Sequence, residues 1–336
     1  MVKYLLVFLL LFGCKDRPVD QFKNPFNNNP EINLTISEVH KKPFRLVVNS
    51  YQESEMDEVF SNLEIQTNKK CSDNKPSIEG QNWVVSALMS GCLNFYMMND
   101  INAYKSFNLI KQLTPGETRD CYTVGFSQFY LMYAFSQCKN ITAIDIDWRI
   151  LHAHYQLLKL IKYDSDKTLN ILNKIKLDPK TKNRHLRTFC SSVDLKSCEI
   201  ALRDFIKYHK EIEKINLQLF FLHHAKFIKT DNTIVVYLSN AIDPEYTTQE
   251  QFNTLVNNIA NALNKQKAYI VYHTGGNEIF AVYSLYKDND KKIIRTICRD
   301  ELVWSDSYGS MARKKYNTYF DTVSQNKMFM GPCTEY

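Results

Sequence analysis

The stretch CYTVGFSQFYLMYAFSQCKNITAIDID, residues 121–147, has the residue types and spacing of a nucleoside-binding strand–helix–strand unit. An apolar strand ends at Gly125, a helical run follows, and the next strand ends in acids that begin with Asp145. A carboxylate at that place can accept both ribose hydroxyls, and glycines in the loop let a ligand approach the backbone. Ser127 and Phe129 stand where a bare backbone is expected, so a working pocket and a fold that has lost its pocket both remain compatible with this stretch.

The same residues also have explanations that require no ligand. Gly125 could form a tight strand-to-helix turn, and Asp145 and Asp147 could cap the next helix, because acids favour helix N-termini. Farther along the chain, Asn240 and Asp243 could satisfy backbone groups of a loop. Taken together, these residues favour a doubly wound sheet, which brings the carboxyl ends of its strands to one edge.

A regular alternation of strands and helices begins near residue 116. Strands are expected at 121–127, 140–147, 216–224, 232–240 and 267–274, helices at 128–138, 148–163, 197–215 and 249–265, and two further strands at 279–287 and 291–304. This order predicts an α/β fold with a doubly wound, mostly parallel sheet and a C-terminal antiparallel strand pair. His154 lies on the apolar face of its helix and is expected to be a core histidine.

The order of elements resembles that of the class I S-adenosylmethionine-dependent methyltransferases over about residues 115–305. In this resemblance Gly125 matches the first glycine of the family's cofactor loop, and Asp145 matches its ribose-binding acid. The resemblance implies a Rossmann-like methyltransferase fold. It also implies that, if the protein is active, S-adenosylmethionine is the cofactor and Gly125, Ser127 and Asp145 hold it.

The segment YLSNAIDPEY, residues 237–246, resembles the end of the fourth strand in the same family. It is especially similar to a branch that includes aminocarboxypropyl transferases and proteins of spirochaetes. The resemblance implies that Ser239, Asn240 and Asp243 line the cleft, and that Asn240 and Asp243 face the acceptor substrate.

Three positions depart from the family's cofactor loop. Thr123 replaces an acid, Ser127 replaces the second glycine and Phe129 replaces the third. A phenylalanine at the start of the helix is expected to crowd the amino-acid end of the cofactor or to fill its site. The sequence therefore supports the family's fold better than it supports the family's cofactor chemistry.

The N-terminus has the pattern of an export signal. Lys3 precedes an apolar run, 4–12, which is too short to span a bilayer and fits the core of a signal peptide. The run ends at Gly13-Cys14, which resembles a bacterial lipobox of the looser spirochaete type. An uncleaved anchor is the alternative. Lipidation of Cys14 would tether the protein stably to a membrane of the cell envelope, with a periplasmic or surface-exposed domain.

These features divide the chain into five parts. They are a lipoprotein signal peptide at 1–13, the lipidated cysteine and a flexible tether at 14–30, an N-terminal helical extension that packs on the core at 31–115, the methyltransferase-like domain at 116–310 and a C-terminal tail at 311–336. The tether is assigned from its prolines and asparagines.

The cysteines favour disulfides over a metal site. Eight cysteines remain after Cys14, an even number in an exported chain, and none stands in a C-x-x-C or Cys/His zinc pattern. The closest neighbours suggest the pairs Cys121–Cys138 and Cys190–Cys198, with buried thiols as the alternative. No metal is expected.

Composition narrows the classes of partner. The 336 residues carry a formal charge of +6, but no block of five or six basic residues occurs, so nucleic-acid binding is not indicated. No G-x-S-x-G motif is present, which disfavours an α/β-hydrolase. No identity is indicated for a protein or small-molecule partner, which leaves the membrane as the expected contact.

Two hypotheses of function remain. The first is a lipoprotein whose methyltransferase-like domain has lost catalysis and acts as a binding or structural module of the cell envelope. The second is an active S-adenosylmethionine-dependent transferase of methyl or aminocarboxypropyl groups. An exported protein is separated from cytoplasmic S-adenosylmethionine, and this compartment favours the first hypothesis.

Overall fold

The structure is a computed structural model of the chain. It describes residues 30–72, 77–92, 100, 103–163, 195–264, 266–273, 280–288, 291–300, 319–326 and 331–333. The expected signal peptide and most of the tether therefore lie outside the described residues, as does Cys14.

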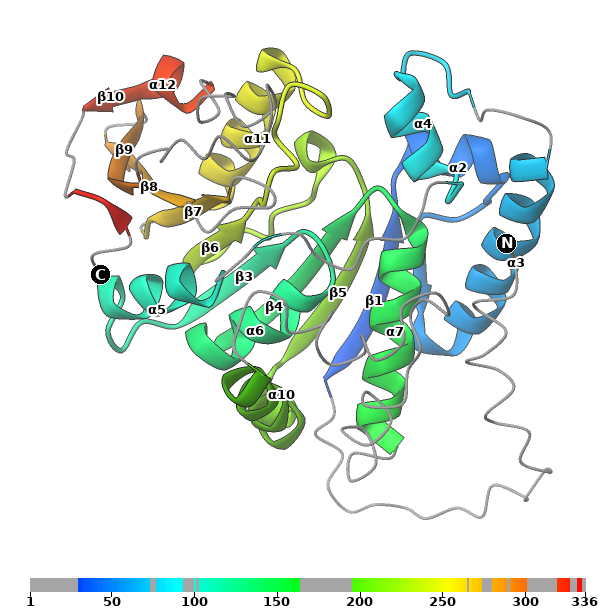
Figure 1. Ribbon diagram of the computed structural model, residues 1–336, viewed down its shortest axis with the longest axis horizontal. Coiled ribbons are helices and arrows are strands. Elements are labelled where there is room, and N and C mark those ends of the chain that lie inside the picture. Colours follow the sequence, from blue (N-terminus) through cyan, green and yellow to red (C-terminus); the bar gives the residue numbers. More distant parts are fainter. Residues whose placement is uncertain are drawn as a thin grey trace.

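Among the described residues, one ten-stranded sheet runs through the molecule (Figure 1), in the order β10-β9-β8-β7-β6-β3-β4-β5-β1-β2. Its strands are β1 (Glu31–Ile36), β2 (Ser50–Gln52), β3 (Arg119–Thr123), β4 (Cys138–Asp145), β5 (Lys214–Leu219), β6 (Thr233–Tyr237), β7 (Ala268–His273), β8 (Phe280–Asp288), β9 (Lys291–Arg299) and β10 (Ser324–Asn326). The helices are α2 (Glu38–Phe44), α3 (Glu53–Ser72), α4 (Trp83–Met89), α5 (Tyr104–Leu113), α6 (Ser127–Ser136), α7 (Trp148–Tyr163), α10 (Leu195–Tyr208), α11 (Gln249–Ala262) and α12 (Tyr319–Val323), with short 3-10 turns η2 (His209–Glu211) and η3 (Leu222–His224).

The centre of the sheet has the strand order of a Rossmann-like fold. Strands β5-β4-β3-β6-β7 are parallel and follow the doubly wound order 3-2-1-4-5. Every residue of β3, β6 and β7 is buried, as expected for parallel strands covered on both faces. The direction of winding reverses between β3 and β6, and this switch point is where such folds bind ligands.

The predicted antiparallel strand pair is confirmed. Strand β8 runs antiparallel to β7, and β9 runs antiparallel to β8, so the two strands extend one edge of the sheet. The short strand β10 then pairs with β9 in parallel.

The N-terminal extension is more than a set of helices. Strand β1 pairs in parallel with β5, and β2 pairs antiparallel with β1, so the extension widens the sheet at its other edge. The segment EINLTI of β1 alternates exposed or half-buried with buried residues, which is the period of a strand. Residues 44–49 form the end of α2 and the loop that leads into β2.

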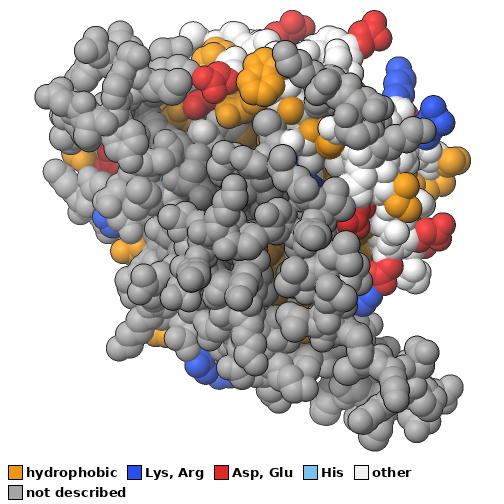
Figure 2. Space-filling view, turned by 45° about the vertical axis from the view of Figure 1, so that its right-hand side comes forward, with side chains coloured by type: hydrophobic (Ala, Val, Ile, Leu, Met, Phe, Trp, Pro, Cys, Tyr) orange, Lys and Arg blue, Asp and Glu red, His pale blue; other side chains and the backbone are white. Residues whose placement is uncertain are grey.

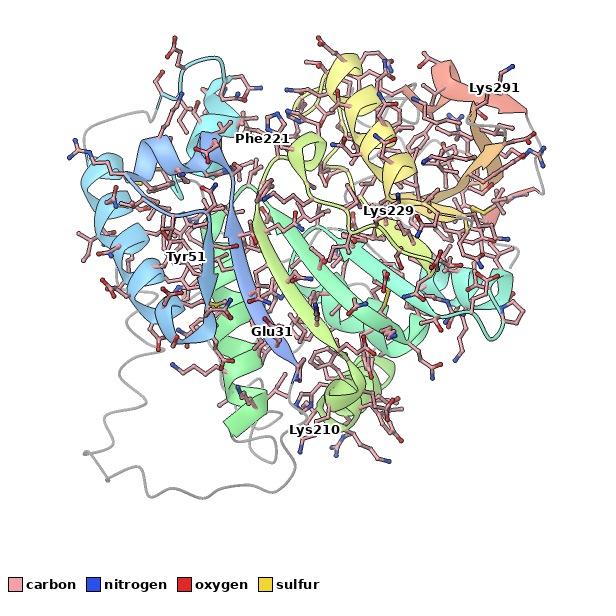
Figure 3. All side chains as sticks on the ribbon, turned by 180° about the vertical axis from the view of Figure 1, so that it is seen from behind. Glu31, Tyr51, Lys210, Phe221, Lys229 and Lys291 are labelled. Atoms are coloured by element: carbon pink, nitrogen blue, oxygen red, sulfur yellow. A yellow bond between two sulfur atoms is a disulfide. The ribbon has the colours of Figure 1, made fainter. Side chains whose placement is uncertain are left out.

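Helices cover the two faces of the sheet unequally. Residues of α3, α5, α6, α7 and α10 pack in one large core on the face toward the viewer in Figure 1. On the other face, α11, α12 and η3 pack against β6, β7 and β8 in a second core. Over β1, β4 and β5 this second face is polar, with Asn33, Thr35, Asn140, Thr142, Asn216 and Gln218. Figure 3 shows this side, with Glu31 and Phe221 near opposite ends of the strands.

Disulfides join distant parts of the described chain. They link Cys71 to Cys92, Cys121 to Cys138, and Cys298 to Cys333. The predicted pair Cys121–Cys138 is thus confirmed and ties β3 to β4. The other predicted pair falls outside the described residues, because Cys190 is not among them.

The surface of the described residues carries both signs of charge. On the face shown in Figure 2, basic and acidic side chains lie interspersed among polar and apolar ones. In the part of the chain that the structure describes, no helix has the length and apolar character needed to cross a bilayer.

Candidate functional site

The switch point lies where the chain leaves β3 and β6. The two loops are held side by side, because Val124 N–H donates to the Tyr237 carbonyl at 3.2 Å. Gly125 follows β3, and Ser239 follows β6 with its carbonyl accepting from His273 N–H at the end of β7. Asp145 ends β4, next to β3. The strand ends therefore bring the predicted loop residues to one edge of the sheet.

Gly125 and Asp145 are in direct contact. Gly125 N–H donates to one carboxylate oxygen of Asp145 at 3.3 Å, and Asp147 N–H donates to the other at 2.9 Å. Both oxygens therefore accept main-chain hydrogen bonds within the protein. This is the arrangement expected of a carboxylate that fixes a loop and a helix start.

Asp145 is poorly solvated for a carboxylate. The residue keeps some exposed surface, but protein surrounds the carboxyl group, and this burial raises its pKa to about 7. The nearby Asp147 raises the pKa further, while the hydrogen bonds from Asp147 N–H and Gly125 N–H act in the opposite direction. Asp145 is therefore partly protonated at neutral pH.

Asp147 caps the start of α7. It accepts from Arg149 N–H at 3.0 Å and pairs with the Arg149 guanidinium at 2.5 Å, and its side chain is almost fully buried. Its geometry is that of a helix cap held by an ion pair.

The glycine at 125 makes room for a side chain of the protein. Its φ is +77°, which favours glycine, and a Cβ there would lie 3.1 Å from Gln128 Oε1. Gln128 is buried and belongs to the first turn of α6. The side chain of Gln128 therefore lies against the backbone of Gly125, which the sequence analysis expects to be open to a ligand.

Ser127 and Phe129 lie in different surroundings from those that the family resemblance implies. Ser127 is fully buried, and its hydroxyl has no hydrogen-bond partner among the described residues. Phe129 is also fully buried, and its ring centroid lies 4.8 Å from that of His154 and 6.0 Å from that of Phe205 on α10. The phenylalanine therefore fills the core beneath α6, so its ring does not block the loop as expected.

His154 is a core histidine, as the sequence predicts. It is fully buried, with Nε2 3.1 Å from the Gly125 carbonyl and Nδ1 3.2 Å from the Tyr130 hydroxyl. Burial lowers its pKa to about 3. The neutral ring thus donates one hydrogen bond to the Gly125 carbonyl and holds the loop from below.

Asn240 and Asp243 shape the loop after β6. Asp243 N–H donates to the Asn240 carbonyl at 2.9 Å, and the Asp243 carboxylate accepts from the Tyr272 hydroxyl at 2.7 Å. Both residues are half-buried. Their contacts are those of a structured turn, and their role toward an acceptor remains a prediction.

A buried acidic cluster, which sequence reasoning missed, lies at the switch point. The Asp100 carboxylate is fully buried, and its Oδ2 accepts from Ser239 Oγ at 2.6 Å, Tyr237 Oη at 2.8 Å and Gln128 Nε2 at 3.2 Å. His273 Nδ1 lies 3.5 Å from Oδ1. We call these five residues the Asp100 cluster. A polar residue at the end of the buried strand 267–274 was one available signal for His273, whereas no pattern marked Asp100.

Asp100 is held as a carboxylate. Burial alone would raise its pKa, but His273 and the hydrogen bonds from Ser239 and Tyr237 outweigh burial and lower the pKa below its ordinary value. The charge is therefore compensated within the protein.

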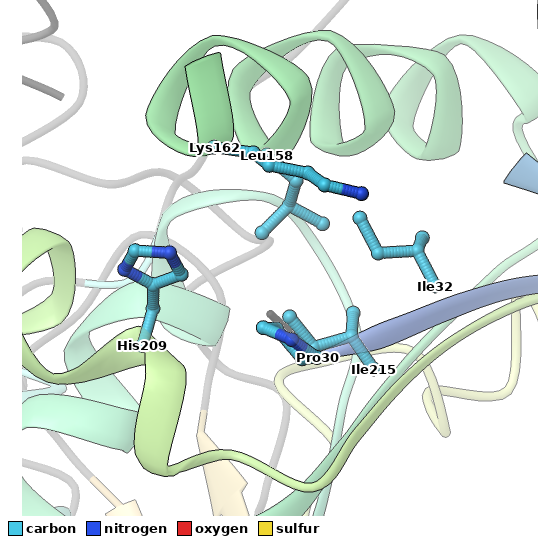
Figure 4. A pocket seen from close by; sticks show the side chains of 6 residues that line it. All are labelled: Pro30, Ile32, Leu158, Lys162, His209 and Ile215. Atoms are coloured by element: carbon cyan, nitrogen blue, oxygen red, sulfur yellow. The ribbon is translucent and has the colours of Figure 1, made fainter. Parts of the chain in front are cut away.

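Two small cavities lie among the described residues, and neither is lined by residues of this edge. The cavities measure about 10 and 20 Å³, each enough for about one water molecule, whereas small-molecule sites occupy roughly 300–1,000 Å³. The first, shown in Figure 4, lies between α7 and the starts of β1 and β5, and His209 lines it. The second lies beside Asp120 and Asn140, in the first halves of β3 and β4.

Comparisons with known proteins give structural matches only. No protein-family model and no curated protein matches the chain. One solved structure that it resembles is the rRNA methyltransferase AviRa from Streptomyces viridochromogenes, with 9% identity, 51% of this chain and 74% of that chain covered, and a TM-score of 0.31.

Two further matches are of the same kind. An S-adenosylmethionine-dependent methyltransferase from Clostridium acetobutylicum ATCC 824 has 9% identity over 63% of this chain and 77% of that chain, with a TM-score of 0.27. The glycopeptide N-methyltransferase MtfA, complexed with sinefungin, has 9% identity over 58% and 69%, with a TM-score of 0.28. Likeness at this level establishes no activity for this chain, and the fold is assigned from its own strand order.

Proposed function

We propose that this chain is a lipid-anchored protein of the bacterial cell envelope whose methyltransferase-like domain no longer binds S-adenosylmethionine. In this proposal the domain acts as a binding or structural module. The observation that carries the proposal is the Asp100 cluster, because a carboxylate of the protein occupies the switch point where folds of this order bind their ligands.

The state of Asp145 supports the loss of the cofactor. Both of its oxygens accept main-chain hydrogen bonds, and its pKa of about 7 leaves it partly protonated at neutral pH. A ribose-binding acid accepts hydrogen bonds from two hydroxyl groups, and a protonated carboxyl group has less acceptor capacity than a carboxylate. The described contacts use this carboxylate to fix the loop at Gly125.

The disulfides support an exported location. Disulfides persist in oxidising compartments and are rare in the cytosol, and here they join Cys71–Cys92, Cys121–Cys138 and Cys298–Cys333. The anchor itself is proposed from Gly13-Cys14 in the sequence.

One observation favours a second candidate, an active S-adenosylmethionine-dependent transferase of methyl or aminocarboxypropyl groups. Gly125 and Asp145 retain the places of a cofactor loop and a ribose acid, and they are in contact. In this alternative Gly125, Ser127 and Asp145 would hold the cofactor, and Asn240 and Asp243 would face the acceptor.

Calorimetric titration of the purified protein with S-adenosylmethionine and its demethylated product separates the two candidates. The proposal expects no heat of binding at micromolar concentrations. Tight binding that Asp145→Ala abolishes would overturn the proposal and establish the transferase. Asp57→Ala, on the exposed side of α3, is the matched control for loss of a carboxylate.

A further inference from the structure

The Asp100 cluster divides into two parts that come from different regions of the fold. The other four residues belong to the Rossmann-like core. Three are hydrogen-bond donors, namely Gln128 in the first turn of α6 and Tyr237 and Ser239 at the end of β6, and the fourth is His273, which ends β7 and lies beside the carboxylate. The acceptor, Asp100, comes from the N-terminal extension. The core therefore presents converging donors, and the extension supplies the anion.

We propose that these core donors form a carboxylate-binding site, which the chain fills with its own Asp100. The ligand class is a small molecule with a carboxylate group, which would bind where the Asp100 side chain now lies. The inference deepens the proposed function, on which it rests for the absence of a cofactor at the switch point.

The arrangement of donors fits a carboxylate. Three donors meet one oxygen at 2.6–3.2 Å, and His273 Nδ1 lies 3.5 Å from the other oxygen. Hydrogen bonds to an ionised acceptor are stronger than bonds between neutral groups, and three of them on one oxygen favour the charged form. Oδ1 makes no hydrogen bond with the described residues, so it has acceptor capacity left.

Ser239 provides independent support for a built site. Its φ is +50°, in the left-handed region that a residue other than glycine seldom adopts. Such conformations persist where the surrounding structure requires them and are concentrated at ligand sites. Here the conformation accompanies a serine hydroxyl directed at the anion, at the shortest distance in the cluster.

The residues of the Asp100 cluster are shielded from solvent. Asp100, Tyr237 and His273 are fully buried, Gln128 and Ser239 nearly so, and the ring of Phe107 on α5 packs 5.2 Å from that of Tyr237. The space filled by the Asp100 carboxyl group suits a planar group with two oxygens.

Chemical rescue tests the site in the whole protein. Asp100→Ala removes a group of the size of formate, and thermal unfolding is then followed in a formate series at constant ionic strength, with chloride as the balancing ion. We expect formate to raise the unfolding midpoint of Asp100→Ala in a saturable way and to leave the wild type unchanged. Adding Ser239→Ala should raise the formate concentration that gives half of this stabilisation by at least about tenfold, because a hydrogen bond to a charged group is lost.

Several results would overturn the inference. They are no effect of formate, an equal effect on the wild type, an equal effect of phosphate, or rescue that Ser239→Ala leaves unchanged. If Asp100→Ala does not fold, the recovery of folded protein on refolding with formate is measured. No recovery would also overturn the inference. Asp100→Asn, which keeps the shape, is expected to be less stable than the wild type, and equal stability would also overturn the inference. If formate rescue fails and the protein still does not bind S-adenosylmethionine, this inference is refuted and the proposed function remains in place.

Discussion

Replacing Asp145 with asparagine is expected to remove a pH dependence that this carboxyl group gives to the stability of the protein. The folded protein holds the proton of Asp145 up to about pH 7, whereas the unfolded chain releases it near its ordinary pKa of 3.8. The folded state therefore binds more protons between these values. Its contribution to stability is fully present below about pH 3.8 and is lost as the pH rises through 7.

The size of the effect follows from the pKa difference. A rise from 3.8 to about 7 is about three units, and each unit corresponds to about 1.36 kcal/mol. Relative to Asp145→Asn, the wild type should thus lose about 4 kcal/mol of unfolding free energy across this window. Because the residue keeps some exposed surface, solvent makes this figure an upper value.

Urea unfolding at a series of pH values measures the difference between the two proteins. Comparison with the variant cancels the buried histidines His40 and His154, whose lowered pKa values give the opposite slope in both proteins. Asp57→Asn removes an exposed carboxylate paired with Lys159 and should change stability by less than about 1 kcal/mol throughout. Parallel profiles for the wild type and Asp145→Asn would refute the reasoning and would show a carboxylate that ionises normally.

Phe129→Ala should cost about 3–5 kcal/mol in urea unfolding, because the fully buried ring fills the core; an unchanged stability would place the ring outside it. Replacing Cys71 and Cys92 together by alanine should cost about 3 kcal/mol in the same assay, because their disulfide closes a separation of 21 residues. Both thiols should resist alkylation in denatured, unreduced protein, and reactive thiols there would contradict the bond. Cys14→Ser should move the protein from the membrane to the soluble fraction and lower its mass by the acyl groups, whereas an unchanged mass and location would exclude lipidation.

The alternation of apolar strands and helices was enough to predict the centre of the fold. Strands such as β6, TIVVY, are buried on both faces and read as continuous apolar runs, and α11 shows its buried face at helical spacing. The first strand, β1, was missed although its six residues alternate with the period of a strand, because it follows a tether rich in proline and asparagine. Its role depends on pairing with β5, which is far away in the sequence.

Only the part of the candidate site that lies in the strand–helix–strand unit at residues 121–147 could be predicted from the sequence. The sequence indicated that Gly125 and Asp145 lie at the carboxyl ends of strands, and the pairing of β3 with β4 brings the two residues into contact. Phe129 was assigned to the loop because a family position does not tell which way a helical side chain points. Asp100 reaches the switch point only through tertiary packing. It lies 137 positions from Tyr237 in the sequence, and its residue type does not indicate that the two side chains form a hydrogen bond.

A crystal structure of the protein grown with excess S-adenosylhomocysteine tests the central claim most directly. We expect the Asp100 carboxylate between Ser239 and Tyr237, and no density for the nucleoside beside Gly125. Density for the nucleoside over Gly125, with its ribose on Asp145 and with Asp100 displaced, would contradict the claim that the protein fills this site itself.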